Sequence, residues 1–355
     1  MNLAVKNARY YDRPDKYSQN MPEYDAIIAG ASFAGLIAAD NIEGNVLLID
    51  KKEIGSGQTS ACATFTSVLE GLGCKSSILQ EFDTLVLHIP EEREVEFVEP
   101  VSTFDYEKFC KTIAHRINAK ILKTSVKGIG GQTVITGSGN FDSQCIIDCT
   151  GWRAALASSL KNDYVDRQKL AFGIESEVKY TDDRLHFFID PNIIAQGAAW
   201  IFPIGNKSRV GLANYAGKTK LLPELTGFLK TMSLDVEAIH GGYIPFGLRE
   251  PVMGNIFMVG DSAGHAPPTT GEGIRYAIKY SRECARIVQN IIDGDKTLEY
   301  GLCEYRDVVY RSKRGYSMLM NMQDRLMANL VPETIKKAAC SRVFSKLFQR
   351  MYLGI

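Results

Sequence analysis

Apolar residues near the start of the chain come in short runs separated by glycine-containing turns. Tyr24–Ala29 is an apolar run suited to a buried parallel strand, and Leu36–Ile42 has the composition of a short helix ended by Gly44. Val46–Ile49 is the next buried strand, and Asp50 follows it. We therefore predict a strand–turn–helix–strand unit over residues 24–50.

Later segments predict a sheet and then a helical end. Strand-like runs at regular spacing favour an antiparallel sheet over residues 171–215. These runs are Ala171–Val178, Leu185–Ile189, Ala199–Phe202 and Arg209–Tyr215. Residues 255–261 predict one more strand, a long helix begins at about Gly273, and helical periodicity returns over residues 300–330.

The turn after the first strand carries a dinucleotide-binding pattern. Gly30 permits the tight turn, Ser32 stands where the backbone approaches a pyrophosphate, and Gly35 lets helix and strand pack closely. The helix N-terminus offers N–H donors to phosphates, and Asp50 is placed to accept from a ribose hydroxyl. A tight turn without a ligand is the alternative. The candidate cofactor-binding residues here are Gly30, Ala31, Ser32, Ala34, Gly35, Asp50 and Lys51.

Composition narrows the class of protein. The 41 Lys and Arg residues balance 41 Asp and Glu residues, so we expect no nucleic-acid partner. The 8 Cys and 5 His residues lack metal-ligand spacing, which predicts no metal site and reduced thiols. The most apolar stretch, residues 26–39, is too short to span a membrane, and residues 1–21 do not resemble a signal peptide. We expect a cytoplasmic protein.

Three motifs in order resemble those of FAD-dependent enzymes of the para-hydroxybenzoate hydroxylase type. Besides the first turn, they are Cys145–Gly151 and the Gly260-Asp261 pair with the helix start that follows it. The resemblance implies that FAD is the cofactor, with Asp261 on its ribityl chain and the helix start aimed at the flavin ring. It adds as cofactor-binding residues Val126, Thr150, Gly151, Gly260, Asp261, Gly271, Gly273 and Ile274.

Within that group the chain resembles the geranylgeranyl reductases. The likeness rests on Cys62 within residues 55–62, on Phe104–Phe109, on Ala198–Gly205 and on Gly241–Pro245. It implies that Cys62 lies beside the flavin and is a candidate catalytic residue; the alternative is that this Cys is a small buried apolar side chain. It also implies that a substrate cavity is lined by Trp200, Phe202 and Pro203.

From the residues alone, Trp200 and Phe202 share a strand face that either lines a cavity or belongs to the core. The chain departs from the family at Ala63 and Thr64, where Gly and an acid are usual. It also departs at Ala198, where an aromatic residue is usual, and at Val101, where Arg is usual.

The predicted fold class is α/β, with a Rossmann-like FAD-binding domain, an inserted antiparallel-sheet substrate domain and C-terminal helices. We expect a polar lead-in at 1–21, a discontinuous FAD-binding domain at 22–84, 101–170 and 249–300, a substrate domain at 85–100 and 171–248, and a helical region at 301–355. Residues 334–355 carry basic but no acidic side chains beside an apolar stripe. This end either contacts an anionic membrane surface or packs on its own domain.

The resemblance implies an FAD-dependent oxidoreductase that reduces carbon–carbon double bonds of a polyprenyl, geranylgeranyl-type lipid by hydride transfer. The alternative is a flavin-dependent monooxygenase or halogenase-like enzyme acting on a small aromatic substrate. A third class is a redox-neutral flavoprotein or a flavin-binding scaffold. Because the sequence shows neither a second nucleotide pattern nor iron–sulfur spacing, we expect transient NAD(P)H or a separate electron carrier as donor. No residue stands out as proton donor.

Overall fold

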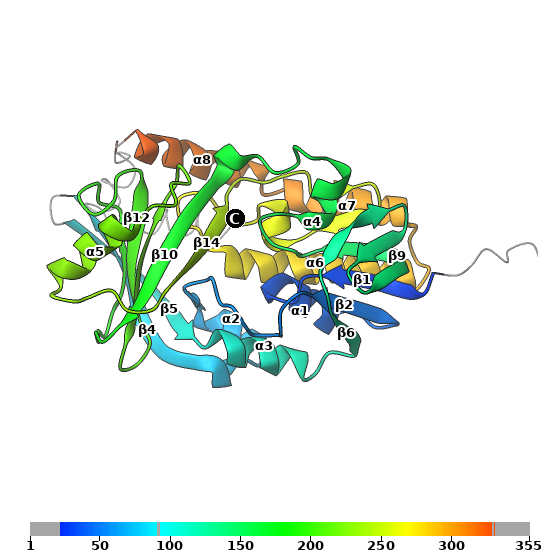
Figure 1. Cartoon of the computed structure of the whole chain (residues 1–355), viewed down its shortest axis with the longest axis horizontal. Coiled ribbons are helices and arrows are strands. Elements are labelled where there is room, and N and C mark those ends of the chain that lie inside the picture. Colours follow the sequence, from blue (N-terminus) through cyan, green and yellow to red (C-terminus); the bar gives the residue numbers. More distant parts are fainter. Residues whose placement is uncertain (1–21, 91–92, 329, 331–355) are drawn as a thin grey trace, which may run out of the picture.

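Two eight-stranded sheets organise the chain, and helices cover the first of them (Figure 1). The computed structural model describes residues 22–90, 93–328 and 330. The lead-in at 1–21 and the basic segment at 334–355 lie outside the described residues. The first sheet has the strand order β15 (Val252–Met253), β16 (Ile256–Met258), β9 (Gly139–Asp148), β1 (Tyr24–Ala29), β2 (Val46–Asp50) and β6 (Ala119–Lys123), with β7 (Val126–Gly130) and β8 (Thr133–Thr136) attached through β9.

The central strands of the first sheet are parallel and buried on both faces. Ala26 and Ile28 of β1 pack on the side of the helices α1 (Phe33–Asp40) and α6 (Gly273–Ile292). Ile27 and Ala29 face the opposite side, where α4 (Ala155–Leu160) packs. This explains why the run Tyr24–Ala29 is apolar throughout instead of alternating. Helices α3 (Tyr106–Ala114) and α7 (Leu298–Tyr310) extend the α1–α6 layer.

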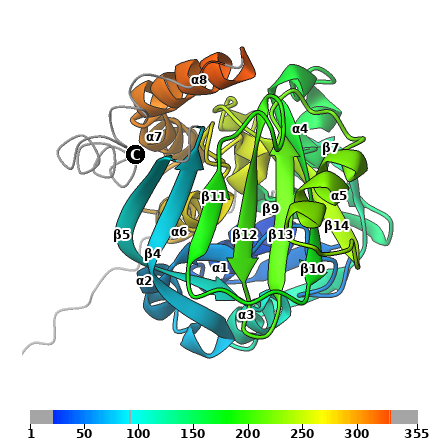
Figure 2. The ribbon, with the colours of Figure 1, turned by 90° about the vertical axis from the view of Figure 1, so that its left-hand side faces the viewer.

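The second sheet is a curved antiparallel layer with one exception (Figure 2). Strand β11 pairs with β4 in parallel. It joins the edge of the β4–β5 hairpin although it comes about a hundred residues later in the chain. Helix α5 (Leu222–Thr231) covers the outer face. The strand order is β14 (Ile239–Pro245), β10 (Leu170–Val178), β13 (Ser208–Asn214), β12 (Gly197–Pro203), β11 (Leu185–Phe188), β4 (Ile78–Ile89), β5 (Arg93–Phe104) and β3 (Ala63–Phe65).

Two helices of the described chain remain, one within the second sheet's chain path and one after the last strand. Helix α2 (Thr66–Gly71) follows β3, and α8 (Lys313–Met327) crosses toward the second sheet after α7. Three short 3₁₀ turns cover Lys75–Ser77, Arg167–Lys169 and Gly260–Ala263. The predicted fold class is therefore confirmed, including the order strand–turn–helix–strand at 24–50 and the long helix from Gly273. The domain boundaries stay a prediction.

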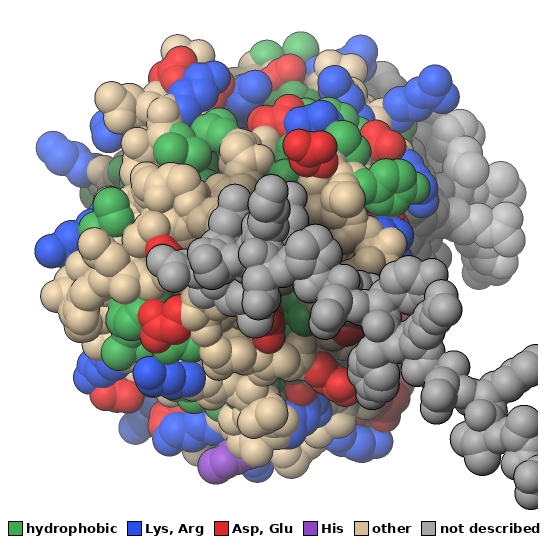
Figure 3. Space-filling view, turned by 90° about the vertical axis from the view of Figure 1, so that its right-hand side faces the viewer, with side chains coloured by type: hydrophobic (Ala, Val, Ile, Leu, Met, Phe, Trp, Pro, Cys, Tyr) green, Lys and Arg blue, Asp and Glu red, His purple; other side chains and the backbone are tan. Residues whose placement is uncertain are grey.

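The surface charge reflects the equal numbers of basic and acidic residues in the sequence. At the end of the molecule that carries the first sheet, basic and acidic side chains are intermixed (Figure 3). Among the described residues no helix is both long and apolar enough to cross a membrane.

The close contact between β1 and α1 depends on two glycines. Gly30 has φ +102°, and an added Cβ there would lie 2.1 Å from the carbonyl oxygen of Cys149. A Cβ at Gly35 would lie 1.7 Å from the carbonyl oxygen of Gly30. Since both obstacles are backbone atoms, no rotamer change could relieve the overlap.

We expect G35A to lower the free energy of unfolding by more than about 3 kcal/mol, the upper range of ordinary overpacking. Urea denaturation followed by circular dichroism measures this change. G71A is the matched control, because a Cβ at Gly71 meets nothing within 4 Å. We expect G71A to be neutral or up to about 1 kcal/mol stabilising. Equal effects of the two substitutions would contradict the packing argument.

Candidate active site

A cavity of about 950 Å³ lies between the two sheets. Its lining begins at the carboxyl ends of β1, β2 and β9 and continues over the inner face of the second sheet. Ligands of open α/β sheets bind at this edge, because the turns that follow parallel strands meet there. The volume is at the upper end of the range for small-molecule sites, about 300–1,000 Å³.

One end of the cavity is built from the predicted dinucleotide turn. Ala31 donates its backbone N–H to the Asp50 carboxylate at 2.7 Å, and Lys52 N–H donates to the same group at 2.8 Å. Asp50 therefore holds the first turn against the end of β2, besides facing the cavity. Ser32 Oγ lies 2.9 Å from the hydroxyl of Tyr106, so its side chain does not cap α1.

The segments near residues 150 and 260 are joined by the carboxylate of Asp148, which is fully buried. One of its oxygens accepts from Thr150 N–H and Oγ–H and from Ser262 Oγ–H, at 2.7–3.0 Å. The other oxygen accepts from Leu156 N–H at 2.9 Å and Ala157 N–H at 3.2 Å. Asp148 thus fixes the turn after β9, starts α4 and anchors the Gly260–Ala263 turn.

Asp261 lies where α6 begins. Its Oδ1 would be 3.6 Å from a Cβ placed on Gly273, and both residues line the cavity. Burial raises the pKa of Asp261 to about 6, an effect that Arg249 opposes. Arg249 donates to the backbone carbonyls of Trp152, Asp261 and Ser262. The carboxyl group therefore lies at the cavity wall with its backbone held in place.

The residues at this end fit FAD. The N-termini of α1 and α6 both line the cavity, and neither helix has a side-chain cap on its free N–H groups. Such N–H groups attract phosphates and the negative pole of a reduced flavin. Two further buried groups on the lining, Thr64 Oγ1 and Gln323 Nε2, have no hydrogen-bond partner among the described residues. A polar ligand in the cavity would satisfy them.

The other end of the cavity is apolar. Trp200 and Phe202 of β12 face it with ring centroids 6.1 Å apart. Trp200 lies across Gly211, where a Cβ would come within 2.4 Å of the indole. The rest of this wall comes from β4, β5, β11 and β12 and comprises Leu85, Leu87, Phe97, Val101, Leu185, Phe187, Ile189 and Ala198.

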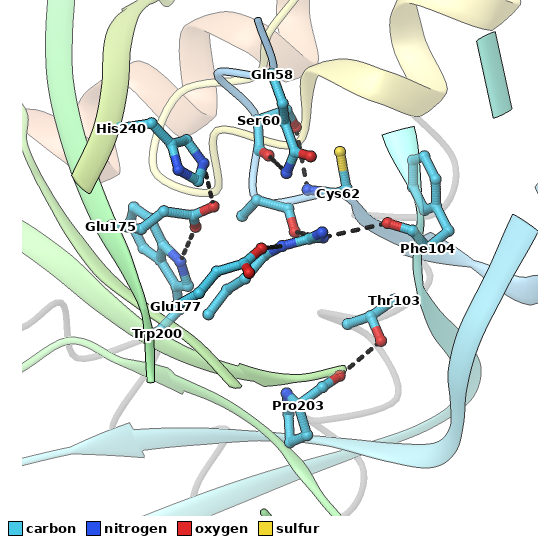
Figure 4. A network of polar contacts seen from close by, with 12 residues as sticks. Gln58, Ser60, Cys62, Thr103, Phe104, Glu175, Glu177, Trp200, Pro203 and His240 are labelled. Carbon is cyan, nitrogen blue, oxygen red and sulfur yellow. Dashed lines mark hydrogen bonds and ion pairs between the residues drawn. The ribbon is translucent and has the colours of Figure 1, made fainter. Parts of the chain in front are cut away.

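Cys62 lies between the two ends in a strained loop. Its φ is +51°, in the left-handed region that residues other than glycine rarely adopt. Its carbonyl accepts from Phe104 N–H at 3.0 Å, and its N–H donates to Ser60 Oγ at 3.2 Å (Figure 4). Arg209, which is 4% exposed, donates to the carbonyls of Ala61 and Phe104. Burial raises the pKa of the Cys62 thiol, which therefore stays neutral.

The structure brings nearly all of the residues predicted from the sequence to this one cavity. Those that line it are Gly30, Ala31, Ser32, Ala34, Asp50, Lys51, Cys62, Val126, Thr150, Gly151, Trp200, Phe202, Gly260, Asp261, Gly271, Gly273 and Ile274. Gly35 lies behind the turn and serves packing. The placement of Pro203 in the lining is wrong: Pro203 is buried outside it, and its carbonyl accepts from Thr103 Oγ at 2.6 Å.

Sequence reasoning missed several polar residues of the lining, among them Glu175 and His240. Glu175 follows Ile174 on β10, lines the cavity and is 2% exposed. The signal available was the pair of acids Glu175 and Glu177 in a strand that is otherwise largely apolar.

No family model matches the chain. Curated relatives do match it over most of its length. A digeranylgeranylglycerophospholipid reductase of Methanococcus aeolicus is 27% identical over 335 aligned residues, which cover 84% of each chain. Another, of Methanococcus vannielii, is 25% identical over 336 aligned residues, again with 84% of each chain covered. The chain is therefore similar over most of its length to the geranylgeranyl reductases, which are FAD-dependent oxidoreductases.

Solved structures show the same fold. A geranylgeranyl bacteriochlorophyll reductase-like protein from Thermoplasma acidophilum superposes with a TM-score of 0.74 at 18% identity, covering 92% of this chain and 99% of that one. A probable FAD-dependent monooxygenase from Pseudomonas aeruginosa gives 0.70 at 15% identity, covering 86% and 96%. The fold is therefore shared by flavoenzymes of several activities. The activity of this geranylgeranyl reductase-like protein must therefore be argued from the cavity.

The geometry of Cys62 predicts a chemically inert thiol. In the native protein at pH 8 we expect brief iodoacetamide treatment to alkylate Cys303, which is exposed, and to leave Cys62 unmodified. Peptide mass spectrometry gives the modified fraction at each site. Treatment in urea should modify both to the same extent. Alkylation of native Cys62 as fast as that of Cys303 would contradict the burial and the neutral thiol.

Proposed function

We propose that this protein binds FAD across the first turn, the Asp148 region and the start of α6, and reduces carbon–carbon double bonds of an isoprenoid lipid. The observation that supports it most is the continuity of the cavity. The polar end of the cavity, which suits a dinucleotide, is continuous with an apolar end that suits a prenyl chain. The relatives named digeranylgeranylglycerophospholipid reductases agree with an isoprenoid substrate.

Bound FAD, in its reduced form, supplies a hydride. The residues of the chain do the rest of the work. The N-terminus of α6 stabilises negative charge on the ring, and Asp261 accepts from the ribityl chain. The apolar wall around Trp200 and Phe202 excludes water and holds the alkene in place. The electron donor that reduces the cofactor is NAD(P)H bound transiently or a reduced carrier protein.

Anaerobic oxidation of the reduced cofactor tests the proposal. Protein reduced with dithionite and freed of excess reductant should recover the absorbance of oxidised flavin when a geranylgeranyl lipid is added. The product should gain two hydrogens per turnover, measured by mass spectrometry. A saturated phytanyl lipid is the control and should give no recovery. Activity that requires oxygen and acts on small aromatic compounds would contradict the proposal and favour a monooxygenase or halogenase.

A larger side chain on the apolar wall should weaken binding of the lipid and leave binding of FAD unchanged. Ala213 lines the cavity and is 6% exposed, so A213F places a ring in the space of the prenyl chain. We expect KM for the geranylgeranyl lipid to rise at least about tenfold, while FAD content stays unchanged; A213V should have a smaller effect. Ten-fold corresponds to about 1.4 kcal/mol of lost binding. Loss of FAD with unaltered KM would place the lipid elsewhere.

Asp261 gives a prediction about pH. Because its pKa is about 6, the carboxylate becomes protonated as pH falls below 6 and loses its strength as an acceptor for the ribityl chain. We expect FAD release, followed by flavin fluorescence, to increase as the pH falls from 7.5 to 5. D261N should bind about tenfold more weakly at pH 7.5 and respond less to pH. The control is D183N, on an exposed loop, and it should match the wild type. Identical pH responses of D261N and wild type would refute this role.

A further inference from the structure

A buried carboxyl and an imidazole meet on the wall of the cavity. Glu175 Oε1 and His240 Nε2 are 2.7 Å apart, and both residues line the cavity. They come from the neighbouring strands β10 and β14 and lie directly opposite each other in the pairing register. Figure 4 shows them on the same side of the site as the loop that leads to Cys62.

Trp200 fixes the carboxyl group of Glu175. Its indole N–H donates to Glu175 Oε2 at 2.9 Å, which leaves Oε1 directed to His240. Gly211 allows this arrangement, since a Cβ there would lie 2.4 Å from the Trp200 ring and 2.6 Å from Glu175 Cβ. Oε1 and Nε2 therefore meet as an ion-pair contact, and neither atom has a hydrogen-bond partner elsewhere among the described residues, so a proton on Nε2 faces the carboxylate.

The surrounding charges keep that proton in place. The hydrogen bond to Glu175 raises the pKa of His240, while burial and Arg209 oppose the rise and Glu177 supports it. Arg209 is engaged elsewhere, with Glu177 at 3.3 Å and with two backbone carbonyls. The side chain of Glu175 is 3% exposed and that of His240 is 27% exposed. The imidazole is therefore partly exposed, and the carboxyl is buried.

The buried thiol of Cys62 and the buried hydroxyls of Tyr106 and Tyr215, which also line the cavity, are less suited to give up a proton. Burial raises the pKa of Cys62. Burial also raises the pKa values of Tyr106 and Tyr215, and their hydroxyls are engaged with Ser32 and with the carbonyl of Thr269. A general acid works best with a pKa near the pH of the reaction, which favours an imidazole.

We infer that Glu175 and His240 together donate the proton that completes reduction of the double bond. This inference rests on the proposed function. One alkene carbon receives the hydride, with its two electrons, from the reduced cofactor, which becomes oxidised. The π electrons form the second C–H bond with the proton of the pair, and the pair is left as a carboxylate and a neutral imidazole. His240 regains a proton from water through its exposed edge.

Two conservative substitutions test the pair. E175Q keeps the acceptor for Trp200 but cannot carry the proton, and H240Q keeps an N–H near Nε2 but cannot titrate. In the anaerobic assay we expect each to slow cofactor oxidation by the alkene at least about a hundredfold, the usual contribution of a general acid. FAD content and KM should stay within about twofold of the wild type. H115Q and E237Q, at exposed positions, are the controls and should retain full rate.

A second measurement is independent of turnover. In histidine NMR titrations, the His240 signal is identified by its loss in H240Q. We expect that signal to titrate at lower pH in E175Q than in the wild type, because the partner that raises its pKa is gone. In the wild type, the rate should fall as pH rises through the same pKa, since the acid is then deprotonated.

The outcomes separate the two claims. If the wild type does not oxidise its reduced cofactor with any prenyl alkene, the proposed function fails. If the wild type does so and both E175Q and H240Q keep more than about a third of its rate, the proton-donor role is wrong. A loss of rate that accompanies loss of FAD would also overturn it, since the pair would then support the fold or the cofactor instead. An unchanged titration of His240 in E175Q would show that the two groups do not share a proton.

Discussion

The buried carboxylate of Asp148 is the interaction on which the site depends. It accepts hydrogen bonds from the turn after β9, from the start of α4 and from Ser262 in the Gly260–Ala263 turn. These segments are about a hundred residues apart in the chain, yet both must face the same cofactor. Because Asp148 is 0% exposed, its carboxylate would destabilise the folded protein if it lacked hydrogen-bond donors. The segments that supply the donors are therefore held in place around the acid. Together with the first turn, this arrangement sets the polar end of the cavity.

The second sheet supplies the broad face of side chains that lines the apolar end of the cavity. Parallel strands end at one edge and present backbone N–H groups, whereas the curved sheet presents a broad face of side chains. Most of that face is apolar, with Trp200 and Phe202 near the middle. Its polar residues include Glu175 and His240, which lie where β10 and β14 adjoin the loop of Cys62. Buried ionisable groups cost stability, so their position on the cavity wall is better explained by chemistry than by folding.

Local segments could be predicted from the sequence, and contacts between distant segments could not. The unit at 24–50 was predicted correctly because Gly30, Gly35 and Asp50 belong to one continuous strand–turn–helix–strand segment. The sequence at Asp148 and Gly151 suggested a strand end, but its five hydrogen bonds depend on Ser262 and on α4. The helical pattern at 300–330 did not reveal the break between α7 and α8. The parallel pairing of β11 with β4 was also not predictable, since periodicity gives the face of a strand and not its partner.

The central claim is that a single cavity holds FAD and an isoprenoid chain side by side. The most direct measurement is mass spectrometry of the small molecules that copurify with the protein under non-denaturing conditions. We expect one FAD per chain and, with it, an unsaturated isoprenoid lipid that is absent from A213F. A protein that carries no FAD and cannot be reconstituted with it would contradict the account, and so would one that carries FAD with only small aromatic ligands.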